Sequence, residues 1–182
     1  IIFLGPPGAG KGTQAVTISK EKNLAHISTG DMLREHVSEE TELGKIAKTL
    51  LDKGKLVPDS LVIEMLQERL LSKDCVNGAI LDGFPRTIAQ AESLDKISDE
   101  FKISKVIVFE ADRDELIKRI LNRGETSGRS DDTKESVRVR LEVYEKDTAP
   151  LIEYYEQENL VAKINAVGEV ENIYNLILKE FE

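Results

Sequence analysis

The stretch GPPGAGKGT, residues 5–13, follows the apolar run of residues 1–4 and has the composition of a phosphate-binding loop. It matches the pattern G-x-x-x-x-G-K-[ST] until the last position, where Gly12 stands and the hydroxyl follows one residue later on Thr13. Glycines let backbone N–H groups turn toward a phosphate, and Lys11 adds a positive charge at the start of a predicted helix. We therefore predict a nucleoside triphosphate site; a glycine-rich turn that holds no ligand is the alternative.

A second candidate constellation is LDGFPRT, residues 81–87, at the end of another apolar run. Asp82 stands at the carboxyl end of the predicted strand, the usual place for the carboxylate that manages magnesium in phosphate-loop enzymes. A turn or cap aspartate is the alternative. The tight turn of residues 83–85 directs Arg86 back over the sheet edge, where a guanidinium can hold a phosphate with two parallel N–H bonds. For Arg86 the alternative is a surface ion pair.

A third segment, ISTGDMLR, follows a further apolar run and brings Thr29, Gly30 and Arg34 to the same edge. Thr29 can cap the next helix, contact a ligand, or do both. The arginines are unevenly placed, and five of the nine in the chain stand at positions 119, 123, 129, 138 and 140. Local placement of this kind suits a small anionic ligand, although the net charge of the chain is -9.

The elements that must position these residues follow from the hydrophobic pattern. We predict strands at residues 1–4, 25–28, 78–81, 105–109 and 160–164, and helices at 11–22, 30–57 (with breaks near Thr41 and Gly54), 59–70, 87–97, 112–122, 134–146, 150–158 and 169–181. Asp59 is the expected cap of its helix, and a polar loop is expected at 124–132. In the first helix, Ala15, Val16 and Ile18 are expected to face inward.

Continuous apolar strands that alternate with helices predict an α/β fold, a doubly wound parallel five-stranded sheet of the P-loop NTPase type. Ligands of such sheets bind beyond the carboxyl ends of the strands, where the three motifs above would meet. A switch GTPase would also carry a phosphate loop, but it would need a guanine-reading Asn-Lys-x-Asp, and the sequence has none.

Length, composition and net charge limit the class of protein. With 182 residues and 40% hydrophobic residues, the chain suits one globular domain. Its net charge of -9 argues against a general nucleic-acid coat. No apolar run approaches the ~18 residues of a membrane span, and no signal peptide is recognisable, so a cytoplasmic protein is expected. Cys75, the single cysteine, leaves no partner for an intrachain disulfide.

Six motifs of the sequence resemble those of a known family. GPPGAGKGTQ, STGDMLR, KGKLVPD, LDGFPRT, NRGETSGRSDD and VRVRL occur in the order, and at about the spacing, found in adenylate kinases. The chain resembles a short-lid member of that group, within the wider nucleoside monophosphate kinases. The resemblance implies transfer of the terminal phosphoryl group of ATP to AMP, giving two ADP, with Mg²⁺ as the metal and with a monomer as the working unit.

The resemblance also implies residue roles. The ATP phosphates would be held by the loop, with two arginines reaching ATP and a glycine near its adenine: Gly8, Ala9, Gly10, Lys11, Gly12, Thr13, Arg119, Arg123 and Gly168. AMP would be held by Thr29, Gly30, Arg34, Lys55, Leu56, Val57, Gly83, Phe84, Pro85, Arg86, Gln90, Arg129 and Arg140. The catalytic set would be Lys11, Asp82, Arg86, Arg123, Arg129 and Arg140. Mg²⁺ would be bound by phosphates and water, with Asp82 ordering that water and no direct protein ligand.

The same resemblance divides the single kinase domain of residues 1–182 into a core and two segments expected to close on substrates. The core would be residues 1–29, 60–122 and 134–182, the NMP-binding insertion residues 30–59, and the short lid residues 123–133. Asp131 and Asp132 would order the lid arginines. Such a lid cannot hold a four-ligand zinc cluster. His26 and His36 belong to no motif and are interpreted as structural or exposed, and Cys75 as an ordinary, partly buried residue.

Two rival functions remain open at this point. A uridylate–cytidylate kinase would share the loop and the short lid, but members that take UMP or CMP tend to have Ala in place of Thr29 and Asn in place of Thr87. A catalytically silent nucleotide-binding module is the rival of another class. Against it, every charged position that the family would use is filled. No sequence feature indicates a membrane or nucleic-acid partner.

Overall fold

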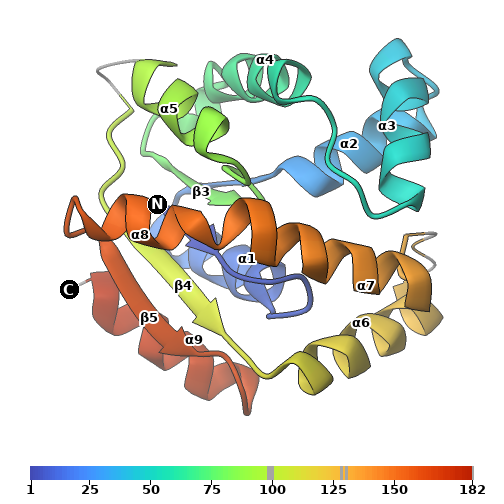
Figure 1. Ribbon diagram of the computed structural model, residues 1–182. Helices are drawn as coiled ribbons and strands as arrows, with labels where there is room; N and C mark the ends of the chain where they lie inside the picture. Colours follow the sequence, from blue (N-terminus) through green and yellow to red (C-terminus); the bar gives the residue numbers. More distant parts are fainter. Residues whose placement is uncertain (98–100, 128, 130, 182) are drawn as a thin grey trace.

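The computed structural model describes residues 1–97, 101–127, 129 and 131–181. Its centre is a parallel sheet in the order β2-β3-β1-β4-β5, with helices on both faces (Figure 1). The strands are β1 (Ile2–Leu4), β2 (Ala25–Ser28), β3 (Ala79–Asp82), β4 (Val106–Glu110) and β5 (Val161–Asn165). The predicted doubly wound five-stranded α/β fold is confirmed.

Each central strand is apolar on both faces because each face carries its own core. Ile2 and Leu4 of β1 join one buried cluster, whereas Phe3 between them joins the other. In β4, Val106 and Val108 alternate in the same way with Ile107 and Phe109. Successive side chains of a strand point to opposite faces, so a sheet covered on both faces needs an uninterrupted apolar run.

The covering helices divide between the two clusters. One face is covered by α4 (Asp59–Leu70), α5 (Ile88–Ile97) and α8 (Pro150–Glu156), and the other by α1 (Lys11–Lys22), α6 (Arg113–Ser127), α7 (Lys134–Val143) and α9 (Val170–Leu178). Ala15 and Ile18 of α1 are buried as predicted, but Val16 is 43% exposed, so its predicted inward position is wrong. At 3.6 residues per turn, position 16 lies about 100° around the helix axis from Ala15 and about 160° from Ile18, away from the face that they share.

Residues 30–57 form two helices, α2 (Thr29–Ser38) and α3 (Glu42–Asp52), which confirms the breaks predicted near Thr41 and Gly54. Thr41 caps α3 by accepting a hydrogen bond from Gly44 N–H. The two helices cross so closely that a Cβ at Gly44 would lie 1.9 Å from the His36 carbonyl oxygen. Ser28, not Thr29, caps α2, since its hydroxyl accepts from Asp31 N–H.

Two further expectations need correction. Asp59 is the first residue of α4, and no side-chain cap is present there; its carboxylate instead accepts hydrogen bonds from Thr87 and Gln90. The polar loop predicted at 124–132 is shorter, because α6 continues to Ser127. The predicted lid, residues 123–133, therefore begins with the last turns of α6, and its residues 128 and 130 lie outside the described part of the chain.

The segment after α7 continues as the π-helical η2 (Tyr144–Thr148) directly into α8, so that these elements cross the molecule almost as one helix (Figure 1). Wide helical turns of this kind are frequent at functional sites. The remaining elements are the short helices η1 (Lys73–Cys75) and η3 (Lys179–Phe181).

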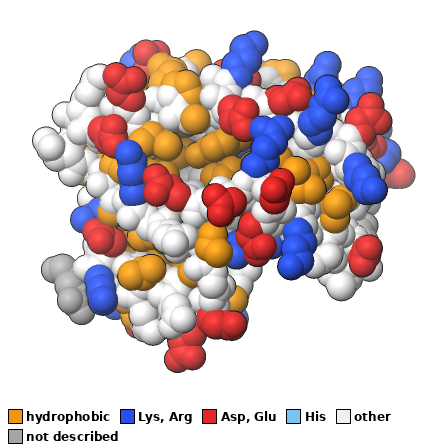
Figure 2. Space-filling view, turned by 60° about the horizontal axis from the view of Figure 1, so that its bottom comes forward, with side chains coloured by type: hydrophobic (Ala, Val, Ile, Leu, Met, Phe, Trp, Pro, Cys, Tyr) orange, Lys and Arg blue, Asp and Glu red, His pale blue; other side chains and the backbone are white. Residues whose placement is uncertain are grey.

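On the face shown in Figure 2, acidic and basic side chains are interspersed around a few apolar patches. None of the helices in the described part of the chain has the length and apolar character of a membrane span.

Candidate active site

The phosphate loop connects β1 to α1 and is packed against α6. Gly8 has a φ of 84°, and a Cβ there would lie 2.8 Å from the Leu116 carbonyl oxygen. Glycine is therefore required at this position for both its conformation and its contact. Lys11 Nζ donates hydrogen bonds to the carbonyl oxygens of Gly5 and Pro6, at 2.8 and 2.9 Å. Burial lowers the pKa of Lys11 to about 8, although the charge of Asp82 opposes this shift.

A cavity of about 430 Å³ opens beyond the carboxyl ends of β1, β2 and β3. It brings together most of the residues predicted for the site: Gly8, Gly10, Lys11, Gly12, Thr13, Gly30, Arg34, Leu56, Asp82, Gly83, Pro85, Arg86, Arg123, Arg129 and Arg140. Among the described residues that line it, six are lysine or arginine and two are aspartate. A strongly cationic cavity thus lies in a chain whose net charge is -9.

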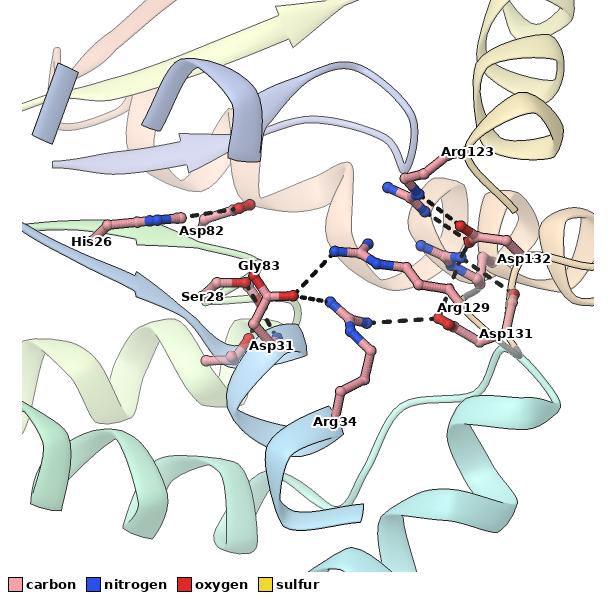
Figure 3. Close-up of polar contacts among 12 residues, drawn as sticks. His26, Ser28, Asp31, Arg34, Asp82, Gly83, Arg123, Arg129, Asp131 and Asp132 are labelled. Atoms are coloured by element: carbon pink, nitrogen blue, oxygen red, sulfur yellow. Dashed lines mark hydrogen bonds and ion pairs between the residues drawn. The ribbon is translucent and has the colours of Figure 1, made fainter. Parts of the chain in front are cut away.

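Asp82 lies at the carboxyl end of β3, on the floor of this cavity. A Cβ at Gly12 would lie only 3.2 Å from Asp82 Oδ2, so the glycine leaves room for the carboxylate beside the loop. His26 Nε2 is 3.6 Å from the same oxygen (Figure 3). Burial by itself would raise the pKa of Asp82, but the contacts with His26, Lys11 and Arg86 lower it below its ordinary value. The aspartate is therefore held ionised.

The turn after β3 orients Arg86. Arg86 Nε and Thr29 Oγ1 both donate to the Gly83 carbonyl oxygen, at 2.7 and 2.8 Å. Thr148 of η2 donates to the carbonyl oxygen of Arg86 at 2.8 Å. Burial lowers the pKa of Arg86 to about 10, and the nearby charge of Arg140 adds to this effect. Such a crowded, desolvated guanidinium is prepared for an anion.

The arginines from α6 and α7 are ordered by Asp132, whose side chain is fully buried. It accepts from Arg123 Nε and Nη2, at 2.6 and 2.7 Å, and from Arg140 Nη1 at 2.7 Å. Asp131 lies 3.7 Å from Arg34 and 3.5 Å from Arg140. These distances agree with the ordering role predicted for both aspartates.

Asp31 of α2 joins the two walls of the cavity. Its Oδ1 accepts from Arg34 Nη2 at 2.5 Å and from Arg129 Nη2 at 3.1 Å (Figure 3). Burial would raise the pKa of Asp31, but its contacts with Arg34 and Arg129 lower it. The carboxylate therefore lies between two guanidinium groups that were predicted as ligands of AMP.

Some predicted residues do not line the cavity. Ala9, Val57 and Phe84 are buried in the packing around it, and Thr29 and Gln90 are buried behind its wall: their relative exposures are all below 5%. Arg119 donates to the Ala166 carbonyl oxygen at 2.9 Å, which places it beside the loop that contains Gly168. Neither of these two residues, nor Lys55, is among those that line the cavity.

Sequence reasoning missed several residues of the cavity wall: Ser28, His26, Asp31, Tyr144 and Thr148. Asp31 could have been predicted from the sequence, because it lies in the STGDMLR motif. For His26 the signal was its place in β2, where it is paired in register with Ile80, two residues before Asp82. Thr148 is contributed by η2, and no local pattern marks it.

A phosphate loop that faces a second set of arginines across one cavity defines a phosphotransferase of the nucleoside monophosphate kinase class. The adenylate kinase family model matches residues 3–160. The chain belongs to the adenylate kinase family.

Relatives support this assignment over almost the full length. The chain is 46% identical to an adenylate kinase of Leptospira biflexa, an alignment that covers 98% of this chain and 97% of the relative. It is 49% identical to an adenylate kinase of Parabacteroides distasonis, with 97% and 94% covered. With an adenylate kinase of Thermus thermophilus the identity is 45%, with 96% and 92% covered.

Proposed function

We propose that this chain catalyses the reversible, Mg²⁺-dependent reaction ATP + AMP = 2 ADP and so balances adenine nucleotides. The observation that supports this most directly is the cavity itself, which has six cationic side chains between the phosphate loop and the α2 wall. Two polyanions repel each other, and a cavity that brings them together must supply opposing charge. Family membership supports the same reaction.

The donor ATP is proposed to bind along the phosphate loop, where the N-terminus of α1 and Lys11 favour its phosphates. Lys11 Nζ, which here contacts loop carbonyl oxygens, would exchange these partners for phosphate oxygens. Arg123 would approach the same phosphates from α6. Arg119 lies beside the loop after β5, and Gly168 lies within that loop. Both suit contact with the adenosine end of ATP.

The acceptor AMP is proposed to bind between α2, the segment of residues 54–57 and the turn after β3. Arg34 and Arg86 line the cavity on that side and would hold its phosphate. Arg129 and Arg140 would bridge the phosphates of both nucleotides from the lid side. The buried Gln90 would meet the base.

The proposed reaction needs no general base. A phosphomonoester has a second pKa of about 6, so the AMP phosphate is mostly dianionic at neutral pH. One of its oxygens would form a bond to the γ-phosphorus of ATP while the bond from that phosphorus to the β–γ bridging oxygen breaks. Lys11 and the arginines would neutralise the charge on the transferring group. Closure over both substrates would exclude water, the competing acceptor.

The residues present fit a magnesium ion held mainly by substrate. Asp82, whose pKa is held below its ordinary value, lines the cavity next to Gly12. Within residues 1–97, 101–127, 129 and 131–181, no group of three or more His, Cys, Asp or Glu side chains could hold a metal by itself. Asp82 would therefore act on Mg²⁺ through water, and the ion would neutralise phosphate charge when bound.

The division into a core, an NMP-binding insertion at residues 30–59 and a lid at 123–133 belongs to this proposal, as do a monomeric state and a cytoplasmic location. The contact of Asp31 with Arg129 supports the idea that insertion and lid meet over the cavity. The family resemblance supports the other two.

An assay with ATP and each of AMP, UMP and CMP tests the proposed function. We expect formation of ADP from AMP with a kcat/KM at least about a hundredfold above that for the pyrimidine nucleotides. Faster turnover of UMP or CMP would instead make the chain a pyrimidine nucleotide kinase. No transfer to any acceptor would indicate a silent nucleotide-binding module.

A further inference from the structure

Asp59 and Gln90 form a hydrogen-bonded pair that joins the first turn of α4 to α5. Gln90 Nε2 donates to Asp59 Oδ1 at 2.8 Å, and Thr87 Oγ1 donates to Asp59 Oδ2 at 3.2 Å. On the other side, Arg86 N–H donates to Gln90 Oε1 at 2.7 Å. Gln90 is 2% exposed. Its carboxamide is therefore held in place on both sides without a ligand.

The two partners determine which end of the Gln90 amide is oxygen and which is nitrogen. An ionised carboxylate can only accept a hydrogen bond, and a backbone N–H can only donate one. A flipped amide would place its oxygen against Asp59 and its NH₂ against Arg86 N–H. Buried groups left without a partner are costly, so one orientation is strongly favoured. Within the described part of the chain, one N–H and one lone pair of the amide have no hydrogen-bond partner.

Neither Asp59 nor Gln90 lines the cavity, but both follow chain segments that line its proposed acceptor side. Pro85 and Arg86, which precede Gln90, line that cavity, and so do Gly54 and Leu56, which precede Asp59. The contact of Asp59 with Gln90 thus ties the two chain segments of the acceptor wall to each other. In the proposed function, Gln90 meets the acceptor base here.

The remaining N–H and lone pair of the Gln90 amide can distinguish a 6-aminopurine from a 6-oxopurine. A 6-aminopurine carries a hydrogen-bond donor at position 6 beside a ring-nitrogen acceptor, whereas a 6-oxopurine carries an acceptor at position 6. In a fixed orientation, the amide oxygen can accept from the 6-amino group while the amide N–H donates to the ring nitrogen. With a 6-oxopurine, the amide oxygen would face another acceptor. Sites built to hydrogen-bond a substrate group reject the analogue that leaves their polar atoms unpaired.

We propose that Asp59 is a positioning residue that fixes the Gln90 carboxamide and thereby makes the acceptor site select 6-amino over 6-oxo purine nucleotides. This inference rests on the proposed function, since it requires AMP to occupy the acceptor side. It assigns Asp59 no contact with the nucleotide.

The test is Asp59→Asn, which keeps the shape of the side chain but can donate as well as accept. The probes are AMP and IMP with ATP as donor, because IMP has the 6-oxo group without the 2-amino group of GMP. We expect the ratio of kcat/KM for AMP to that for IMP to fall about tenfold, mainly through KM. Asp114→Asn is the matched control. It removes an exposed first-turn aspartate of α6 and should leave the ratio unchanged.

A double variant separates positioning from a general structural effect. If Asp59 acts through Gln90, then Asp59→Asn should not change the AMP to IMP ratio further in a Gln90→Ala background. A further tenfold fall there would overturn the proposal. So would an unchanged ratio in the folded single variant.

Should Asp59→Asn not fold, Thr87 offers a second route to the same question. Thr87→Val removes the hydroxyl that donates to Asp59 Oδ2, and Thr87→Ser keeps it. We expect a ratio at least about threefold lower in the valine variant than in the serine variant, and equal ratios would overturn the proposal. The proposed function fails by a different result, in the wild-type chain: either no ADP forms from ATP and AMP, or UMP or CMP is turned over faster than AMP.

Discussion

Arg129 Nη2 lies 3.1 Å from Asp31 Oδ1, a contact between residues 98 positions apart that joins the proposed lid to α2 across the cavity (Figure 3). The same carboxylate accepts from Arg34. Arg34 and Arg129, both proposed to contact phosphate, thus share one aspartate. Because an anion competes with this carboxylate for both guanidinium groups, its binding should rearrange the lid and α2 together.

The first prediction concerns this closure. A bisubstrate inhibitor that joins adenosine groups through phosphates should slow hydrogen exchange in residues 30–59 and 123–133 by about tenfold or more, because both segments gain contacts with bound phosphates. Mass spectrometry of proteolytic peptides measures the exchange in each segment. β4, whose Val106–Phe109 run is already buried, is the internal reference and should change little. Unaltered exchange in both segments would contradict closure.

The second prediction compares two arginines of the same helix. Arg140 lines the cavity and is held by Asp132, whereas the side chain of Arg138 is 76% exposed and pairs with Glu142. Arg140→Ala should lower kcat by about 10²–10³-fold, since it removes charge from the transferring phosphoryl group. Arg138→Ala should stay within about twofold of the wild type, because an exposed ion pair contributes little. Steady-state kinetics with ATP and AMP measures both.

The third prediction concerns Gly12, the position at which the loop departs from the common pattern. A Cβ there would lie 3.2 Å from Asp82 Oδ2, so Gly12→Ala should displace the carboxylate. We expect kcat to fall about tenfold and the Mg²⁺ concentration for half-maximal activity to rise.

The control for that variant is Thr17→Ala, an exposed change further along α1. It should leave the Mg²⁺ dependence unchanged. Equal Mg²⁺ dependence in Gly12→Ala and wild type would show that the glycine does not serve the contact with Asp82.

The fourth prediction follows from Lys11, whose pKa burial lowers to about 8. Below pH 8 the free ammonium group is charged, and as pH rises above 8 it loses its proton. Bound phosphates favour the charged form, so ATP binding should take up about half a proton near pH 8. Affinity for ATP should weaken as pH rises further.

Calorimetry in buffers of different ionisation enthalpy measures this uptake. Lys11→Ala should abolish it, whereas Lys20→Ala, an exposed change in the same helix, should retain it. Proton uptake that persists without Lys11 would assign the titration to another group.

Much of the site could be predicted because its parts are local. The loop of residues 5–13 is proposed to bind phosphate through its own glycines and the helix that follows, so nine consecutive positions are enough to recognise it. Strands such as β4 are recognisable because a sheet covered on both faces requires continuous apolar residues. Parallel strands then bring their carboxyl ends to one edge, and the motifs that follow them had to meet there.

Other features depend on residues far apart in the chain. Helix α6 extends beyond its predicted end to Ser127, and Arg123 in its added part bonds to Asp132, which lies beyond the helix. Asp59 read locally is a helix cap, but Thr87 and Gln90 of another element supply stronger partners for its carboxylate. For Asp59, short-range propensity was overruled by long-range contacts.

The sequence by itself therefore determined the fold class, the phosphate loop and the set of arginines, since each depends on the order and spacing of nearby residues. Only the tertiary structure decided which of these side chains pair with one another. The positions of His26 beside Asp82, Asp31 between Arg34 and Arg129, and Asp59 against Gln90 arise from the packing of separate elements. Such pairings depend on the distances between packed backbones, and no local pattern encodes those distances.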